Sequence, residues 1–238
     1  MAPPRFFDPA CPELIDRPDT DPASVRQELA ALEAINRRLG GHAFMVDYVR
    51  RSAHSFGLSS VRILDLGTGL ADIPRAIAKW ARRAGVAVSI LAVDANPKVL
   101  TFARESCRDW PEIEFVQGDM AALDYGDSSF DLVLCSLALH HFEASAAVSI
   151  LRGMEGVARR GYIVNDLRRN WAAIGLTHLL SRATGKNHLI RHDGPHSCRA
   201  AFTVPELCAL AEQAGLKSYH IRKHSFMYLM ALEGQKVG

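Results

Sequence analysis

The chain has 238 residues, of which 48% are hydrophobic and 23% charged, and its formal net charge is +2. These values are typical of a soluble globular protein, and the length fits one α/β domain with added segments. So small a net charge does not support binding to nucleic acid or to an anionic membrane, and we expect neither partner.

The five cysteines are widely scattered and form no C-x-x-C pair, which favours reduced thiols. No apolar run has the length that crosses a bilayer, and the first residues lack the basic and apolar regions of a signal peptide. We therefore predict a cytoplasmic monomer or homodimer with no membrane span and no metal site.

The first part of the chain precedes any strand. Residues 1–20 contain five prolines and no periodicity, which favours an extended arm, with disorder as the alternative. Asp21 and Pro22 supply an N-cap and a first-turn proline for a helix over about 21–39, and a second helix follows over about 42–55. Two helices ahead of the first strand have no place in a sheet. We expect them to pack outside the sheet or over a ligand-binding cleft.

The central stretch, VRILDLGTGLAD, occupies residues 61–72. Its apolar run predicts a strand buried on both faces, and Gly67 and Gly69 allow a sharp turn after it. A helix then runs from about Ala71 to Arg83, and Gly85 ends it. A strand, a glycine turn and a helix form the first half of a βαβ unit, whose ligand lies outside the carboxyl end of the strand.

The charges around this turn indicate what kind of ligand it binds. Asp65 precedes the first glycine, and Asp72 occupies the position where a dinucleotide-binding loop has its third small residue. Two carboxylates would repel a pyrophosphate across a partly desolvated gap. They favour a ligand that is positively charged at this point and carries no phosphate.

Further acids follow the next strands in chain order. A second strand over about 86–93 ends at Asp94, whose carboxylate we expect to bind ribose hydroxyls. Its alternative role is to cap the helix of about 97–107, but Asn96 with Pro97 suits that role better. A short third strand, in IEFVQGDM, ends at Asp119. Strand four covers Phe130 to Ser136, a helix follows near 144–155, and strand five spans about 161–167.

DLGTGLAD resembles the first motif of the class I S-adenosylmethionine-dependent methyltransferases, although Ala71 stands where that family most often has a third glycine. SFDLVLCSLALHHF resembles the fourth motif of the ubiquinone and menaquinone biosynthesis type. The resemblance implies that Asp119 and Met120 contact adenine. It also implies a binding site for S-adenosylmethionine, or its product S-adenosylhomocysteine, formed by ten residues: Asp65, Gly67, Gly69, Asp72, Asp94, Ala95, Asp119, Met120, Ser136 and Leu137.

The remaining sequence predicts a cap and the end of the sheet. A helix of about 170–183 and a basic, histidine-rich loop up to 202 would form the substrate cap. Thr203 with Glu206 forms a capping box for a helix that Gly215 ends. The last strands, about 217–223 and 225–232, are so close in sequence that they must pair antiparallel.

We therefore predict an α/β, Rossmann-like, seven-stranded mixed sheet whose last strand pair is antiparallel. Helices cover both faces, with N-terminal helices before the sheet and a helical cap inserted after strand five. The expected parts are an arm with lid helices, the cofactor-binding core, the substrate cap and the closing helix with its hairpin, at residues 1–57, 58–167, 168–202 and 203–238.

Methyl transfer is an in-line displacement, so that positioning supplies much of the catalysis. A protonated acceptor also benefits from a general base, and histidine titrates in a suitable range. His140 and His141 are the leading candidates for that base. Four residues of the segment after strand five are the candidates for substrate binding: Arg168, His178, Arg191 and His192.

The sequence thus favours a small-molecule methyltransferase of secondary metabolism that acts on an aromatic or polyketide-like hydroxyl. Alternatives are methylation of a carbon on a quinone-like ring and a catalytically silent protein that binds S-adenosylmethionine. A dinucleotide oxidoreductase is disfavoured by Asp72. An RNA methyltransferase is disfavoured because LALH follows strand four in place of an Asn/Asp-Pro-Pro-Tyr-like tetrapeptide.

Overall fold

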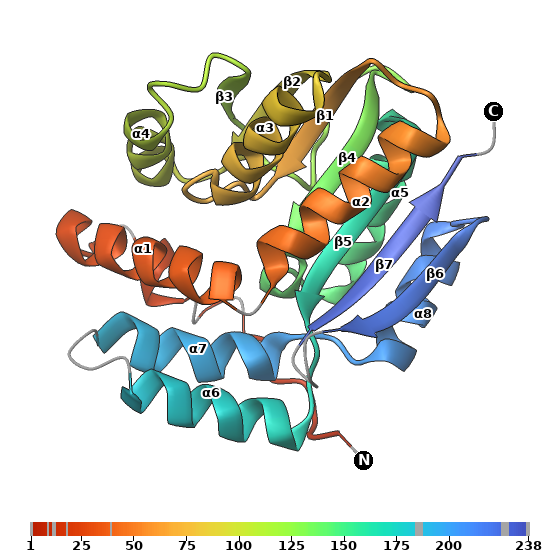
Figure 1. Ribbon diagram of the computed structural model, residues 1–238. Helices are drawn as coiled ribbons and strands as arrows, with labels where there is room; N and C mark the ends of the chain where they lie inside the picture. Colours follow the sequence, from red (N-terminus) through yellow and green to blue (C-terminus); the bar gives the residue numbers. More distant parts are fainter. Residues whose placement is uncertain are drawn as a thin grey trace.

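A computed structural model describes residues 2–8, 10, 13–17, 19–38, 40–183, 188–224 and 229–236. In this part of the chain seven strands form one sheet (Figure 1). The strands are β1 (Ser60–Leu66), β2 (Ala87–Asp94), β3 (Ile113–Gln117), β4 (Phe130–Ser136), β5 (Ala158–Leu167), β6 (Tyr219–His224) and β7 (Leu229–Gln235). The helices are α1 (Pro22–Arg38), α2 (Gly41–Ser55), α3 (Asp72–Ala84), α4 (Pro97–Ser106), α5 (Ala144–Val157), α6 (Trp171–Ala183), α7 (His188–Ala200) and α8 (Val204–Ala214), with two 3-10 turns, η1 (Leu14–Asp16) and η2 (Leu139–His141).

The strand order is β3-β2-β1-β4-β5-β7-β6. β1 to β5 pair in parallel, whereas β7 lies antiparallel between β5 and β6. The strand order reverses between β1 and β4, which is the position where open α/β sheets bind their ligands. The predicted fold class is confirmed, including the antiparallel final pair.

Two apolar layers enclose the sheet. β4 shows why, since its alternate residues Leu132 and Leu134 pack into one layer and Val133 and Cys135 into the other. α2 and α3 cover the first face, and α5 and α8 cover the second (Figure 1). A strand buried on both faces reads as a continuous apolar run, which is how β1 and β4 stand out in the sequence.

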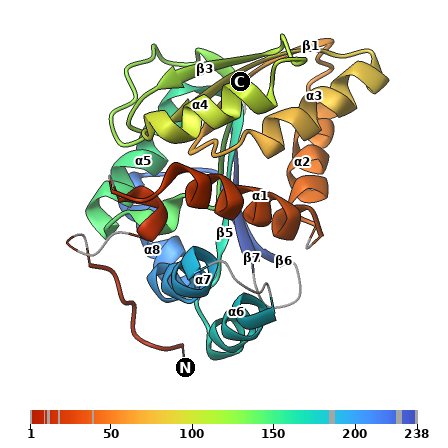
Figure 2. The same ribbon diagram turned by 90° about the vertical axis from the view of Figure 1, so that its left-hand side faces the viewer.

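A third group of elements lies across the carboxyl ends of the strands. α1 runs between the loops of the sheet and the α6–α7 pair (Figure 2). The described residues of the N-terminal arm pack beside α7, where the Asp193 carboxylate accepts hydrogen bonds from Leu14 N (3.0 Å) and Ile15 N (3.1 Å). Arg5 donates from the arm to the carbonyls of Ala200 and Phe142, at 2.6 Å each. The arm and α1 therefore lie over this end of the sheet, whereas α2 packs on one of its faces.

Several local signals in the sequence have their expected effect. Thr203 and Glu206 form the predicted capping box, and Gly85 and Gly215 end α3 and α8 in the left-handed conformation. Asn96 caps α4 by accepting a hydrogen bond from Lys98 N, which leaves Asp94 available for another role.

The predicted histidine-rich loop before residue 202 was wrong, because residues 188–200 form α7. Gly194 and Pro195 argued against a helix, since proline lacks the N–H that a helix interior needs. In the structure α7 packs along α6 and the arm, and the side chains of Asp193, Ser197 and Cys198 are buried there. Tertiary packing outweighs the local preference of these residues.

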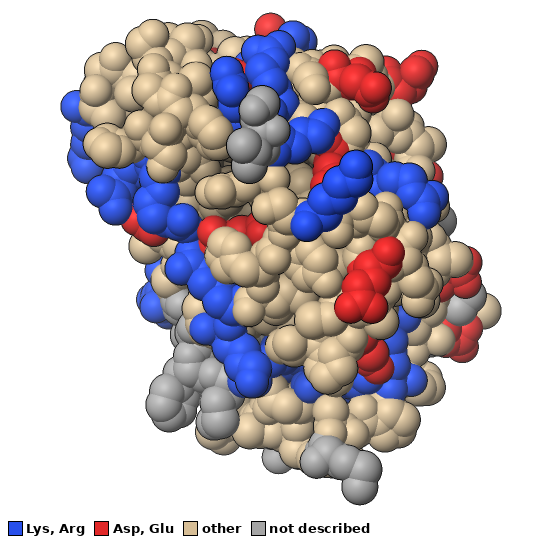
Figure 3. Space-filling view, turned by 90° about the vertical axis from the view of Figure 1, so that its right-hand side faces the viewer, with Lys and Arg blue, Asp and Glu red and all other residues tan. Residues whose placement is uncertain are grey.

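Charged side chains of both signs alternate over the face that Figure 3 draws. The buried Glu233 of β7 pairs with Arg51 of α2 at 3.2 Å and with Arg222 of β6. Among the described helices, none combines the length and the apolar character needed to span a bilayer.

Candidate active site

The turn between β1 and α3 is held in a left-handed conformation that brings its backbone close to neighbouring groups. Gly67 and Gly69 have φ values of 69° and 54°. The amides of Gly67 and Thr68 both donate to the carbonyl of Val93 at the end of β2, at 2.9 and 3.0 Å. This turn therefore joins the carboxyl ends of β1 and β2.

Replacing Gly67 by alanine should disrupt this turn. The new Cβ would lie 2.6 Å from the Cβ of Ala138 and would add a strained positive φ. We expect the free energy of unfolding to fall by about 2–4 kcal/mol, measured by denaturant titration. Gly69→Ala is the matched control, because its Cβ would meet nothing within 4 Å and only the positive φ is penalised. Equal losses in both variants would contradict this account.

Three carboxylates, those of Asp65, Asp72 and Asp94, surround the turn. Asp94 accepts hydrogen bonds from Gly69 N and Asn96 N, both at 3.0 Å. Asp72 contacts Nε2 of His42 at 2.6 Å and Nδ2 of Asn36 at 3.1 Å, which ties the end of α1 and the start of α2 to the turn.

Burial strongly affects two of these acids. It raises the pKa of Asp65 to about 7, with a further contribution from the nearby charges of Asp72 and Asp94. Burial also raises the pKa of Asp94. Both carboxylates are thus held where negative charge is costly, so that a cationic ligand would stabilise their ionised forms.

A cavity of about 260 Å³ opens at this edge of the sheet. Its lining includes all ten residues expected to contact the cofactor, together with His141: Asp65, Gly67, Gly69, Asp72, Asp94, Ala95, Asp119, Met120, Ser136 and Leu137. The arm and α1 complete the wall with Glu13, Ile15, Leu29, Leu32, Glu33 and Asn36. Elements far apart in the sequence thus enclose one space.

The two candidate catalytic histidines have different surroundings. His141 lines the cavity, whereas His140 is only 3% exposed and is not part of the lining. The His140 ring contacts Asp166 through Nδ1 at 2.7 Å, and its backbone N–H donates to the same carboxylate at 2.9 Å. Burial opposes the charged form of His140, but Asp166 and Glu13 outweigh it and raise the pKa of the imidazole.

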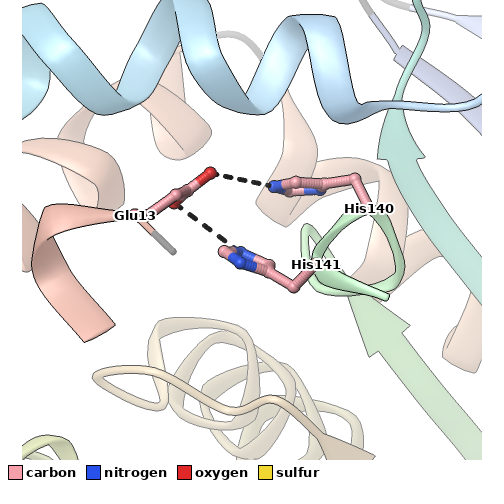
Figure 4. A group of neighbouring side chains, drawn as sticks. All are labelled: Glu13, His140 and His141. Carbon is pink, nitrogen blue, oxygen red and sulfur yellow. Dashed lines mark ion pairs between the residues drawn. The ribbon is translucent and has the colours of Figure 1, made fainter. Parts of the chain in front are cut away.

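Glu13 is a site residue that the sequence did not indicate. Its carboxylate is buried between the two histidines, 3.8 Å from Nε2 of His140 and 3.8 Å from Nε2 of His141 (Figure 4). Ser197 of α7 donates a hydrogen bond to the same carboxylate. Glu13 stands in a proline-rich segment without periodicity, so that only its folded position associates it with the histidines.

The four predicted substrate-binding residues, Arg168, His178, Arg191 and His192, are not among the residues that line the cavity. Arg191 and His192 stay outside the cavity because residues 188–200 form the helix α7. Its buried side, with Asp193 and Ser197, meets the arm, and Arg191 and His192 lie exposed. The arm and α1, which come from the opposite end of the sequence, occupy the place that these residues were expected to fill.

The described core has the fold of the S-adenosylmethionine-dependent methyltransferases. A methyltransferase of this kind from Aquifex aeolicus superposes with a TM-score of 0.62 at 16% identity, covering 92% of this chain and 100% of that one. Residues 63–161 match the family model described as "Methyltransferase domain". These findings show that the chain has a class I methyltransferase fold, and that its residues 63–161 are similar to the methyltransferase-domain family.

Two curated relatives match part of the chain. A malonyl-[acyl-carrier protein] O-methyltransferase of Halorhodospira halophila is 30% identical over 156 residues, which are 61% of this chain and 50% of that protein. A demethylmenaquinone methyltransferase of Deinococcus radiodurans is 32% identical over 92 residues, 38% of this chain and 36% of that protein. The matches thus span half or less of these relatives.

Proposed function

We propose that the chain is a methyltransferase that binds S-adenosylmethionine and transfers its methyl group to a hydroxyl oxygen of an aromatic or polyketide-like small molecule. The observation that carries this proposal is the cavity, in which Asp65 and Asp94, at the carboxyl ends of β1 and β2, and Asp72 of the turn share the lining with His141. Both curated relatives are named as methyltransferases, one of them for O-methylation.

The residues of the cavity fit this cofactor. Its ammonium and sulfonium are cationic, and the buried carboxylate of Asp65 favours a cation nearby because its own ionisation is suppressed. Asp94 lies where the second strand of a nucleotide-binding fold presents an acid to the ribose hydroxyls. Asp119 and Met120, in the loop after β3, line the cavity, and we expect them to contact adenine. When bound, S-adenosylmethionine supplies the electrophilic methyl group.

The protein then has two tasks at the acceptor. The arm, α1 and η2 enclose the cavity and can hold the acceptor oxygen in line with the methyl carbon, which contributes up to about 7–11 kcal/mol in favourable systems. His141 lines the cavity, and as the general base it would take the proton from the acceptor hydroxyl. His140 supports the turn that presents His141, because Asp166 fixes both its ring and its backbone N–H.

His141→Ala should therefore lower turnover by about 100-fold or more while leaving the affinity for S-adenosylmethionine nearly unchanged. The measurement is transfer of a tritium-labelled methyl group to substituted resorcinols, with cofactor affinity determined by calorimetry. His140→Ala is the companion variant. We expect it to lower the melting temperature as well as turnover, because it leaves Asp166 buried without its imidazole partner.

If neither variant changes turnover, the general-base proposal fails and positioning alone remains. Demethylmenaquinone serves as a second acceptor, because one curated relative is named for it. NMR of the product made with a carbon-13-labelled methyl group separates an O-methyl from a C-methyl product. Cofactor binding without transfer to any of these acceptors would instead favour the silent binding protein.

A further inference from the structure

Glu13, His140 and His141 form a compact group of potential metal ligands at one wall of the cavity. One donor atom from each lies within 4.8 Å of the other two. Figure 4 shows both imidazole rings turned toward the Glu13 carboxylate, each ring facing a different oxygen. The group joins the N-terminal arm to η2.

The distances within this group are too long for hydrogen bonds. An N–H donor of a charged histidine approaches a carboxylate oxygen to about 2.7–2.9 Å, as His140 does with Asp166 at 2.7 Å. Each Glu13 oxygen is instead 3.8 Å from the nearest imidazole nitrogen. Metal–ligand bonds of about 2.0–2.2 Å place neighbouring donor atoms about 3–3.5 Å apart. A small inward movement would thus complete a metal site.

The surrounding hydrogen bonds favour metal binding by this group. When Nδ1 of His140 carries the proton, it donates a hydrogen bond to Asp166. The other ring nitrogen, Nε2, then has its lone pair free for a metal ion on the side of Glu13. Histidines that bind metals commonly have such a carboxylate on their other nitrogen. Ser197 orients the Glu13 carboxylate in the same way from α7. Asp166 therefore orients His140, and Ser197 orients Glu13.

We propose that Glu13, His140 and His141 bind one divalent transition-metal ion such as Zn²⁺ or Fe²⁺. Two imidazoles and one carboxylate are a donor set that suits these ions, and three protein ligands leave coordination positions open. The open positions face the cavity, since Glu13 and His141 line it. The ion also fastens the arm onto the core, because Glu13 belongs to the arm.

Metal binding has a consequence for the reaction that rests on the proposed function. The ion occupies the His141 nitrogen that would otherwise take a proton. In the metal-loaded enzyme the ion, as a Lewis acid, would make the acceptor hydroxyl easier to deprotonate, and its proton would pass to solvent. Metal binding can be measured without turnover, so that the metal site and the methyl transfer can fail separately.

The test uses the whole 238-residue chain, freed of metal with a chelator that is then removed. We expect equilibrium dialysis against Zn²⁺ to give one bound ion per chain, and Co²⁺ to give the visible absorption bands of a four- or five-coordinate site. Glu13→Gln and His141→Asn should each weaken the affinity by at least about tenfold, and Asp166→Asn by about 10–100-fold. Glu33→Gln is the matched control, because Glu33 lines the same cavity but pairs with Arg75.

The absence of the Co²⁺ bands in the unmutated protein would overturn the proposal without reference to any variant. Equal Zn²⁺ affinity in Glu13→Gln, His141→Asn and Glu33→Gln would also overturn it, because the bound ion would then lie elsewhere. Circular dichroism of each variant shows whether it is folded.

Discussion

Asp94→Ala should weaken the binding of S-adenosylmethionine by about 10–150-fold, while the protein remains folded. The carboxylate is expected to hold the ribose hydroxyls, and a hydrogen bond to a charged group contributes about 1.5–3 kcal/mol. The carboxylate also accepts a hydrogen bond from the Gly69 amide, so that the variant loses one contact that orders the turn. Isothermal titration calorimetry gives the affinity directly.

Asp94→Asn is the control for the role of the carboxylate in the turn. Its amide oxygen can still accept from Gly69 N, whereas the negative charge is lost. We expect an affinity between those of the unmutated protein and Asp94→Ala. Unchanged affinity in the alanine variant would count against the ribose assignment, and a matching loss of melting temperature would point to a structural role only.

Asp65 should link cofactor binding to the release of a proton. Its pKa of about 7 in the free protein means that much of the carboxyl is protonated below neutrality. A bound ammonium favours the ionised form, so that the affinity for S-adenosylmethionine should fall by about tenfold for each pH unit below about 7. At about pH 6, calorimetry in buffers with different ionisation enthalpies should detect close to one proton released.

Asp65→Asn should abolish this proton release and weaken binding at neutral pH. Although Asp65→Asn weakens cofactor binding, it should stabilise the folded free protein. The pKa of Asp65 is raised from 3.8 to about 7, so the unfolded chain ionises first as the pH rises. Stability of the free protein is therefore lost between these two values and stays low above them. The variant should be more stable than the parent above neutral pH, by a few kcal/mol at most. A pH-independent affinity in the parent would contradict the assignment.

The core of the fold was predictable because its signals are local. The strand, glycine turn and helix of residues 61–84, the Thr203–Glu206 capping box and the close final strands each depend on a few neighbouring residues. Acids that end parallel strands meet at one edge of the sheet. The sequence therefore grouped Asp65, Asp94 and Asp119 correctly around one cavity.

The part of the cavity around His140 and His141 could not be predicted from local sequence, because it depends on contacts between distant parts of the chain. Glu13 meets the histidines only through the packing of the arm against α7. α7 itself contains Gly194 and Pro195, which locally favour a loop. The sequence paired His140 with His141 as equivalent candidates, whereas burial beside Asp166 separates their roles.

We expect the carboxylates at the carboxyl ends of the strands to select a cationic nucleoside that carries no phosphate. Calorimetric titration of the same protein sample with S-adenosylmethionine and with NAD tests this selection most directly. We expect S-adenosylmethionine to bind at least about 100-fold more tightly, a difference of about 3 kcal/mol, because a pyrophosphate would lie beside Asp65 and Asp72. Equal or tighter binding of NAD would contradict the account.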